Sequence, residues 1–271
     1  MPSKGSGEFE RGYIVPIGGC ENWISPEVCE QLRGLCLSAQ AKASILNISE
    51  QELEHQIAPV LTDNGFVECS VINIQNRQDA QNSDNLDKMQ AADILIIAGE
   101  RPLQISTLIG GTLIAKQIRK LNADGVHVVG TFGGATILSE HMIAGGQDGT
   151  TPTQNGVTMA PGIGLTNRFM VDYHFEQQGR LGRLLTALSY NPFTLGIGID
   201  DGTALFISPK DELVVFGTGA ATLIDPSNLQ YSSMGSAGSG DPISLFGLQM
   251  HILAQGARFT CENHSYDEHW A

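Results

Sequence analysis

The regular alternation of short apolar segments with longer amphipathic segments over the first half of the chain constrains the fold more than any other feature. Apolar runs suited to buried strands lie at residues 13–17, 43–48, 66–74, 92–97 and 126–129. Helices are predicted between them at residues 26–41, 50–64, 79–90 and 103–121. The segment at 79–90 is polar, and the segment at 103–121 carries apolar residues at helical spacing. Because crossover helices join strands that run in the same direction, this order predicts an α/β fold with a mostly parallel sheet and helices on both faces.

The second half of the chain has fewer helical segments and shorter strands. Helices are predicted at residues 135–143 and 177–190, a strand at 168–173, and a long surface loop at 147–161. Short strands follow at 194–199, 203–207, 212–217 and 221–224, then a Ser/Gly-rich loop at 231–240 and a last apolar segment at 245–252. The strands predict a small antiparallel extension at the C-terminus.

The sequence shows no internal repeat and no linker between domains. We therefore expect a flexible tail at 1–11 and a single α/β domain at 12–271.

Charge and cysteine content exclude several classes of protein. The net charge is −14 and the Lys and Arg residues form no cluster, which argues against a nucleic-acid partner. No apolar run approaches the roughly 20 residues that cross a bilayer, so no membrane partner is expected. The five cysteines form no Cys-x-x-Cys pair, which is typical of reduced thiols in a cytoplasmic protein.

A glycine-rich corner follows the strand at 126–129. The sequence Gly-Thr-Phe-Gly-Gly-Ala at 130–135 leads from this buried strand into the predicted helix at 135–143. In α/β hydrolases such a corner lifts a nucleophile to the top of the sheet, and the next backbone N–H joins an oxyanion hole. A Ser or Cys is expected at the apex of the corner, but the residue there is Phe132.

Five motifs in the same order resemble those of cyanophycinase, a peptidase E-like serine peptidase that cuts a polymer with an aspartate backbone and arginine side groups. Residues 14–21 resemble the opening Ile-Gly-Gly-Ala-Glu of that family, and 97–101 stand where it has Thr-Gly-Gly-Asp-Gln. Residues 130–135 stand for Gly-Thr-Ser-Ala-Gly-Ala, and 171–184 and 196–201 closely match two further motifs. The resemblance implies a flavodoxin-like or class I glutamine amidotransferase-like fold.

The resemblance also assigns catalytic roles to residues of this chain. It implies that His174 is the base and that Asp201, where the family has Glu, orients it. It implies that backbone N–H groups around Gly99 and Gly133 form the oxyanion hole, and that Phe132 occupies the position of the lost nucleophile. The ring of Phe132 has no lone pair with which to attack a carbonyl, so it either blocks the cleft or packs as core.

Three nearby hydroxyls are alternative nucleophiles. Thr131 precedes the apex, where a side chain normally points away from the cleft, and Thr136 and Ser139 lie farther along the predicted helix. A nucleophile must lie within hydrogen-bond reach of its base, which none of these positions favours.

The substrate-binding residues that the resemblance implies are partly changed: Arg101, Asp172, Tyr173, Gln178, Arg180 and Arg183. Arg180 and Arg183 match the family and share a face of the predicted helix, as a carboxylate-binding pair should. Gln178 replaces an Arg, while Arg101 and Tyr173 each replace a Gln. Without the family motif, the two arginines would be read as a solvated or structural pair.

The sequence predicts no cofactor and no metal, because it contains no Gly-x-Gly-x-x-Gly motif and no metal-ligand spacing of His, Cys or Glu. The leading hypothesis is a cyanophycinase-like chain without peptidase activity that forms a homodimer or heterodimer with a cyanophycinase-like chain. One alternative is an active exopeptidase that releases β-Asp-Arg dipeptides from cyanophycin with a non-standard nucleophile. The other is a protein that binds cyanophycin or its dipeptide without cutting it.

Overall fold

A computed structural model describes residues 10–20, 23–52, 55–261 and 265–267. The first half contains, in order, β1 (Ile14–Ile17), α1 (Pro26–Leu35), β2 (Lys42–Asn47), α2 (Ile57–Asp63), β3 (Glu68–Asn73), the 3-10 turn η2 (Asp79–Gln81), α3 (Ser83–Gln90), β4 (Ile94–Gly99), α4 (Pro102–Ile109), α5 (Leu113–Ala123), β5 (His127–Phe132) and α6 (Gly133–Thr136). The second half contains β6 (His141–Gly146), β7 (Val157–Pro161), β8 (Phe169–Tyr173), α7 (Leu181–Tyr190), β9 (Leu195–Ile199), β10 (Thr203–Ile207), β11 (Glu212–Gly217), β12 (Ala221–Asp225), β13 (Tyr231–Ser232), β14 (Leu245–Phe246), β15 (Gln249–Leu253), β16 (Arg258–Thr260) and β17 (Ser265–Asp267).

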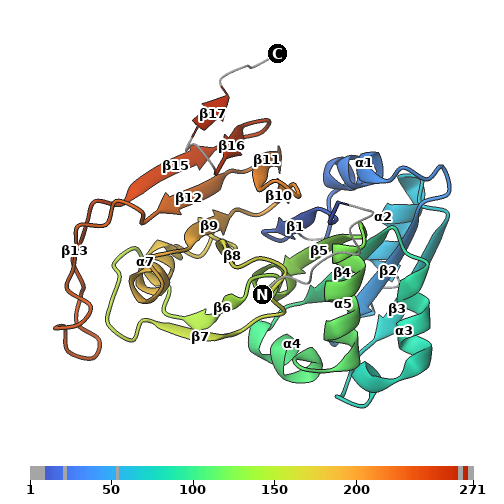
Figure 1. The fold of residues 1–271 in the computed structure, drawn as a ribbon, viewed down its shortest axis with the longest axis horizontal. Helices are drawn as coiled ribbons and strands as arrows, with labels where there is room; N and C mark the ends of the chain where they lie inside the picture. Colours follow the sequence, from blue (N-terminus) through green and yellow to red (C-terminus); the bar gives the residue numbers. More distant parts are fainter. Residues whose placement is uncertain (1–9, 21–22, 53–54, 262–264, 268–271) are drawn as a thin grey trace.

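A parallel sheet forms the centre of the molecule, with the strand order β3-β2-β4-β5-β1 (Figure 1). Successive side chains of β4 are buried on opposite faces. Ile94 and Ile96 pack with α1 and α2, whereas Leu95 and Ile97 pack with α3, α4 and α5. A strand covered on both faces needs a continuous apolar run, which residues 94–97 supply. The predicted α/β fold, with a mostly parallel sheet flanked by helices on both faces, is confirmed.

Antiparallel strands at the C-terminus are also confirmed, but they divide between two sheets and do not form one appendage. Strands β10, β11, β16 and β17 extend the central sheet beyond β1, where β10 pairs antiparallel with β1. A second sheet has the order β15-β12-β9-β8, in which β8 and β9 are parallel. Phe169, Val171 and Leu223 of this second sheet belong to the same buried cluster as Leu95 and Ile97, so the two sheets share a core.

The predicted helix at 103–121 is two helices, α4 and α5, because glycines interrupt it. Gly111 has a φ of +71°, and a Cβ on Gly110 would lie 2.4 Å from the carbonyl oxygen of Ser106. The side chain of Thr112 then caps α5 by accepting a hydrogen bond from the N–H of Ala115 at 3.5 Å. Helical spacing continues across this break, which is why the sequence pattern did not reveal it.

The predicted helix at 135–143 is wrong after its first residues. Helix α6 ends at Thr136, and residues 141–146 form β6, which pairs antiparallel with β7. The predicted loop at 147–161 therefore ends in a strand. The β6–β7 ribbon is held by its own cross-strand pairing and by packing of Ile143 against α7, contacts that local spacing does not encode.

Several other predicted boundaries shift. Helix α1 ends at residue 35 and not 41, α2 begins at 57 and not 50, and α7 begins at 181 and not 177. The predicted helix at 79–90 is split by Asn82, whose side chain caps α3. Within the apolar segment at 245–252 lie β14 and most of β15. Most of the predicted tail at 1–11 lies outside the described residues, although Arg11 forms an ion pair with Asp211 at 2.7 Å.

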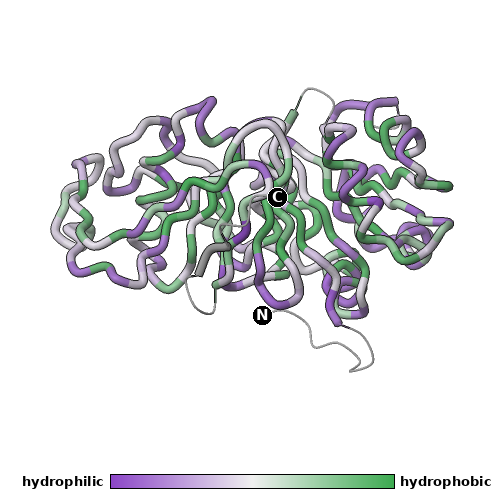
Figure 2. Tube along the Cα trace, turned by 90° about the horizontal axis from the view of Figure 1, so that it is seen from above, coloured by the Kyte–Doolittle hydropathy of each residue, from purple (hydrophilic) through white to green (hydrophobic). Residues whose placement is uncertain are grey.

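Hydrophobic residues concentrate in the central strands, and hydrophilic segments lie around them (Figure 2). Within the ranges that the structure describes, no helix combines the length and the apolar character needed to cross a membrane.

Candidate active site

The corner between β5 and α6 has the tight geometry that its glycines predict. A Cβ on Gly134 would lie 2.1 Å from the carbonyl oxygen of Ile97, and a Cβ on Gly130 would lie 2.1 Å from that of Gly134. Phe132, at the apex, has a φ of 54° and a ψ of −124°. A non-glycine residue held with a positive φ stores about 1–3 kcal/mol of backbone strain, which persists where the surroundings impose it.

The ring of Phe132 packs within an aromatic cluster. Its centroid lies 4.7 Å from that of Trp23, 5.1 Å from that of His174 and 6.5 Å from that of Tyr173. Gly19 completes the enclosure, because a Cβ there would lie 2.8 Å from the His174 ring and 2.9 Å from the Phe132 ring. The ring therefore occupies the space beside the predicted base, and it is also packed against Trp23.

His174 and Asp201 are in direct contact. The ring Nδ1 of His174 is hydrogen-bonded to Oδ1 of Asp201, so an Asp reaches the ring despite being one methylene shorter than a Glu. The backbone N–H of His174 donates to the carbonyl of Gly18 at 3.1 Å, and the N–H of Asp201 donates to Oε1 of Gln177 at 3.0 Å. With Nδ1 engaged, Nε2 is the nitrogen left to accept a proton. Their role as base and orienting acid stays a prediction.

The three alternative hydroxyls are buried. Thr131 Oγ1 donates to the carbonyl of Trp23 at 2.9 Å, and Thr136 Oγ1 donates to that of Gly133 at 3.0 Å. Ser139 is also fully buried. None of these hydroxyls is therefore accessible to a substrate.

Gly99 and Gly133, the predicted oxyanion donors, lie next to the apex. Gly99 is opposite Phe132 in the register of β4 and β5, and a Cβ on Gly133 would lie 2.9 Å from the carbonyl oxygen of Gly99. The hydroxyl of Tyr173 donates to the carbonyl of Glu100 at 2.9 Å and so ties β8 to the end of β4. The fold thus brings these groups together at the carboxyl ends of β4, β5 and β8.

Among the predicted substrate-binding residues, Asp172 and Arg183 form a buried ion pair. Asp172 is 0% exposed and Arg183 is 6% exposed, and Nε of Arg183 donates to Oδ2 of Asp172 at 2.6 Å. Burial by itself lowers the pKa of the Arg183 guanidinium, but the hydrogen bond and the charge of Asp172 outweigh it and hold that pKa above its ordinary value. Arg183 is therefore closed to solvent, and it stabilises the site through its ion pair with Asp172.

Arg180 is also buried, and it lies across Tyr173. Its guanidinium carbon is 4.5 Å from the centroid of the Tyr173 ring, and Nη2 donates to Oε1 of Gln178. Burial raises the pKa of Tyr173, and the charge of Arg180 offsets part of that rise. The two arginines therefore do not form the exposed pair that their spacing allowed. Arg101, by contrast, is exposed and forms an ion pair with Glu50 at 3.1 Å.

Trp23 and its partner Gln56 were missed by the sequence reasoning. Trp23 is 2% exposed, has a φ of 67°, and donates through Nε1 to Oε1 of Gln56 at 2.8 Å. Trp23 is one of only two tryptophans, and it follows a Gly-Gly pair in a segment without predicted structure. These two features are the signal in the sequence that could have indicated a role for Trp23. Across the described ranges, no three His, Cys, Asp or Glu side chains gather as a metal site needs.

Comparison with known proteins identifies relatives over most of the chain. Residues 42–237 match the model of peptidase family S51. A cyanophycinase from Geminocystis herdmanii (strain PCC 6308) is 28% identical over 262 residues, which cover 95% of this chain and 96% of the relative. A cyanophycinase from Synechococcus elongatus is 29% identical over 262 residues, which cover 94% of this chain and 80% of the relative.

Two solved structures share the fold. The crystal structure of a peptidase from an acI-B1 Actinobacterium has a TM-score of 0.68 at 19% identity and covers 92% of this chain and 97% of its own. A putative peptidase E protein from Listeria monocytogenes EGD-e has a TM-score of 0.54 at 14% identity and covers 77% of this chain and 100% of its own.

Proposed function

This chain belongs to peptidase family S51, and from that membership we propose that it is a cyanophycinase-like protein without peptidase activity of its own. We further propose that it works as a subunit, paired either with itself or with an active cyanophycinase-like chain. Its five cysteines form no Cys-x-x-Cys pair, which suits a reducing compartment, so the proposed location is the cytoplasm.

The contact between the Phe132 ring and the His174 ring carries the proposal. A serine peptidase needs a hydroxyl next to its base, and here an aromatic ring lies at that position with its centroid 5.1 Å from that of His174. The same ring fills the space in which a scissile carbonyl would approach the base. The burial of Thr131, Thr136 and Ser139 argues against the alternative of a substitute hydroxyl.

The structural features around Phe132 support a role that needs the folded site but not peptide-bond hydrolysis. The tight corner, the contact between His174 and Asp201, and the buried pair of Asp172 with Arg183 are all present. Burying an ion pair carries a large desolvation cost. We would therefore not expect these features in a chain in which this region had no role.

The decisive experiment is an assay of β-Asp-Arg release from cyanophycin, with Phe132→Ser as a parallel sample. We expect no release by the unmodified protein. In Phe132→Ser the new hydroxyl lies beside the retained His174, so we expect measurable release. Since a positioned base contributes about 10²–10⁴-fold, Phe132→Ser/His174→Ala should fall back to background.

Release by the unmodified protein would overturn the proposed loss of activity. Thr136→Val serves as the matched control, because it removes a buried hydroxyl that we expect to take no part in any residual rate. The subunit role is tested separately by native mass spectrometry of the protein alone and mixed with an active cyanophycinase. A monomer in both samples, at concentrations up to the solubility limit, contradicts it.

A further inference from the structure

Strand β15 carries apolar side chains on both of its faces, although only one face is packed in the core. Leu253 is 7% exposed and belongs to the buried cluster that the two sheets share, whereas Met250 is 50% exposed and Ile252 is 62% exposed. The solvent face of an antiparallel sheet ordinarily carries polar side chains, and apolar residues on both faces are typical of a strand that is covered on both. The exposed face of β15 therefore has the composition of a covered face.

Helix α7 covers this face of the sheet only as far as β12. Met250 is opposite Ile224 in the register of β12 and β15, and opposite residues share a face of the sheet. Ile224 is fully buried, in one cluster with Leu184 and Leu188 of α7. One strand farther out, Met250 and Ile252 lie beyond the reach of the helix and stay exposed.

The outer edge of β15 is open as well. β15 is the last strand of its sheet, with β12 on one side and, in the described part of the chain, no strand on the other (Figure 1). Its outward backbone N–H and C=O groups can therefore pair with another strand. Natural edge strands are commonly protected by a charged residue or a proline, as Glu68 protects β3, but Gln249–Leu253 contains neither.

An exposed pair of aromatic rings precedes β15 in the chain. Tyr231 of β13 is opposite Phe246 of β14, their ring centroids are 5.8 Å apart, and the two side chains are 52% and 60% exposed. With Met250 and Ile252 they make four of the ten large apolar side chains exposed in the described residues. Single exposed apolar side chains are ordinary, but a concentration of them marks an interaction surface. We call these four residues the β15 surface.

The distribution of charge indicates what covers the β15 surface. Between Asp225 and Arg258 the chain carries a single charged residue, Asp241, although 16% of all residues are charged and the net charge is −14. Two copies of so acidic a chain repel each other wherever their charged surfaces meet. The uncharged segment lets two copies approach without that repulsion, whereas a strongly charged partner would be recognised by a cluster of the opposite charge.

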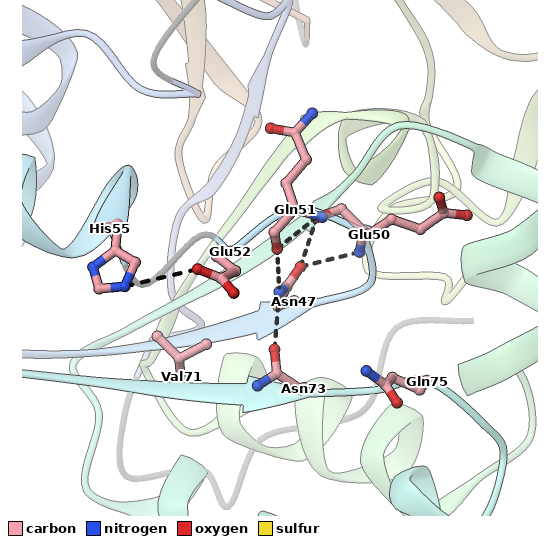
Figure 3. Close-up of a pocket in the computed structure, with 9 residues that line it drawn as sticks. Asn47, Glu50, Gln51, Glu52, His55, Val71, Asn73 and Gln75 are labelled. Atoms are coloured by element: carbon pink, nitrogen blue, oxygen red, sulfur yellow. Dashed lines mark hydrogen bonds and ion pairs between the residues drawn. The ribbon is translucent and has the colours of Figure 1, made fainter.

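The carboxyl ends of β2 and β3 offer no comparable surface. A cavity of about 430 Å³ opens there, and its lining includes Glu50 and Glu52 (Figure 3). Glu50 is paired with Arg101 at 3.1 Å and Glu52 with His55 at 3.9 Å, and both carboxylates are exposed. A second acidic chain would meet two carboxylates here, so this end of the sheet is disfavoured as a contact between copies.

We propose that β15 pairs antiparallel with β15 of a second copy of this chain, about a two-fold axis near His251. Two identical edges paired in this way are self-complementary, because each strand supplies the backbone groups that the other lacks. With that centre, Met250 of each copy lies opposite Ile252 of the other, and the two sheets join into one. The inference rests on the proposed function in one respect, the role as a subunit, and it names the partner as a second copy.

This contact lies away from the candidate active site. β8 leads into His174 and is at the opposite edge of the same sheet from β15, and β9, which leads towards Asp201, lies between them. A second copy would therefore extend the sheet that holds His174 and Asp201 without lying beside them. Dimer formation and peptide release can accordingly be measured as separate properties.

The test is native mass spectrometry and sedimentation velocity of the full-length protein over a dilution series, in which we expect a dimer. Met250→Glu/Ile252→Glu should weaken dimerisation by at least about a hundredfold, because pairing would place carboxylates opposite one another. Met250→Lys/Ile252→Lys should weaken it similarly through its ammonium groups. A mixture of the two variants should form a mixed dimer, because each Glu then lies opposite a Lys, and this recovery requires both variants to be folded.

Leu37→Glu/Val67→Glu is the matched control, because it adds the same two charges at exposed apolar positions outside the β15 surface. It should dimerise like the parent protein. A monomeric parent, dimers of both β15 variants, a mixture that stays monomeric, or an equal loss in the control would overturn the inference.

Failure of this inference is distinguishable from failure of the proposed function. If the protein paired only with an active cyanophycinase, a second copy would be the wrong partner, yet the role as a subunit would stand. Because none of these measurements involves cleavage, the peptidase assay of Phe132→Ser still decides the proposed loss of activity on its own.

Discussion

At the scale of single residues, Phe132 combines favourable ring packing with an unfavourable backbone. Its φ of 54° and ψ of −124° lie in a region that glycine adopts readily and other residues avoid. Phe132→Ala and Phe132→Gly lose the same ring contacts, but Gly also releases the strain. We therefore expect Phe132→Gly to be more stable than Phe132→Ala by about 1 kcal/mol in urea unfolding.

Lys116 provides the control for this prediction, because it is exposed in the middle of α5. There Ala should be more stable than Gly by about 1 kcal/mol, the ordinary order in a helix. If Ala were also the more stable residue at position 132, the corner would not be strained at Phe132.

At the scale of elements, the packing of α6 against β4 depends on Gly134. A Cβ there would lie 2.1 Å from the carbonyl oxygen of Ile97, and because that atom is backbone, no side-chain rotation can relieve the clash. We expect Gly134→Ala to lower the free energy of unfolding by about 2 kcal/mol or more, since α6 must move away from the sheet. Urea unfolding of the variant and the parent protein measures the difference.

Gly34 near the end of α1 is the matched position, because a Cβ there would meet no neighbouring atom within 4 Å. Gly34→Ala should raise stability by about 0.5–1 kcal/mol, because it adds helix propensity without a clash. Similar effects of the two Ala substitutions would contradict the close approach of α6 to β4.

At the scale of the whole molecule, buried thiols make stability depend on alkaline pH. Burial raises the pKa of Cys29 to about 12, of Cys36 to about 11 and of Cys261 to about 12, from an ordinary value of 9.0. Because the folded state keeps these protons while the unfolded state loses them above pH 9, stability is full below pH 9 and falls between pH 9 and 12.

Cys29, which is fully buried, gives the clearest measurement. Between pH 8 and pH 10 its thiol alone should remove about 1 kcal/mol of stability. Cys29→Ala should therefore show a smaller loss over this pH interval than the parent protein, even though it is less stable at pH 8. An equal loss in both proteins would mean that Cys29 does not control this decline.

Much of the fold follows from the sequence because its signals are local. The apolar run at 94–97 must be buried on both faces, and strands alternating with helices must run parallel, so the central sheet could be predicted. The resemblance to cyanophycinase is confirmed by the family match and by the relatives. The corner could be placed because Gly130 and Gly134 allow a close approach that other residues would block.

Only the tertiary structure decided which neighbours each residue meets. Residues 141–146 became a strand because β7 pairs with them, and Trp23 reached Phe132 from a segment without a pattern of its own. The spacing of three positions from Arg180 to Arg183 indicated a shared helix face, but whether that face met water or Asp172 depended on β8. Spacing along the chain fixes local geometry, whereas burial and partnership depend on segments far apart in sequence, and these determine the state of the candidate site.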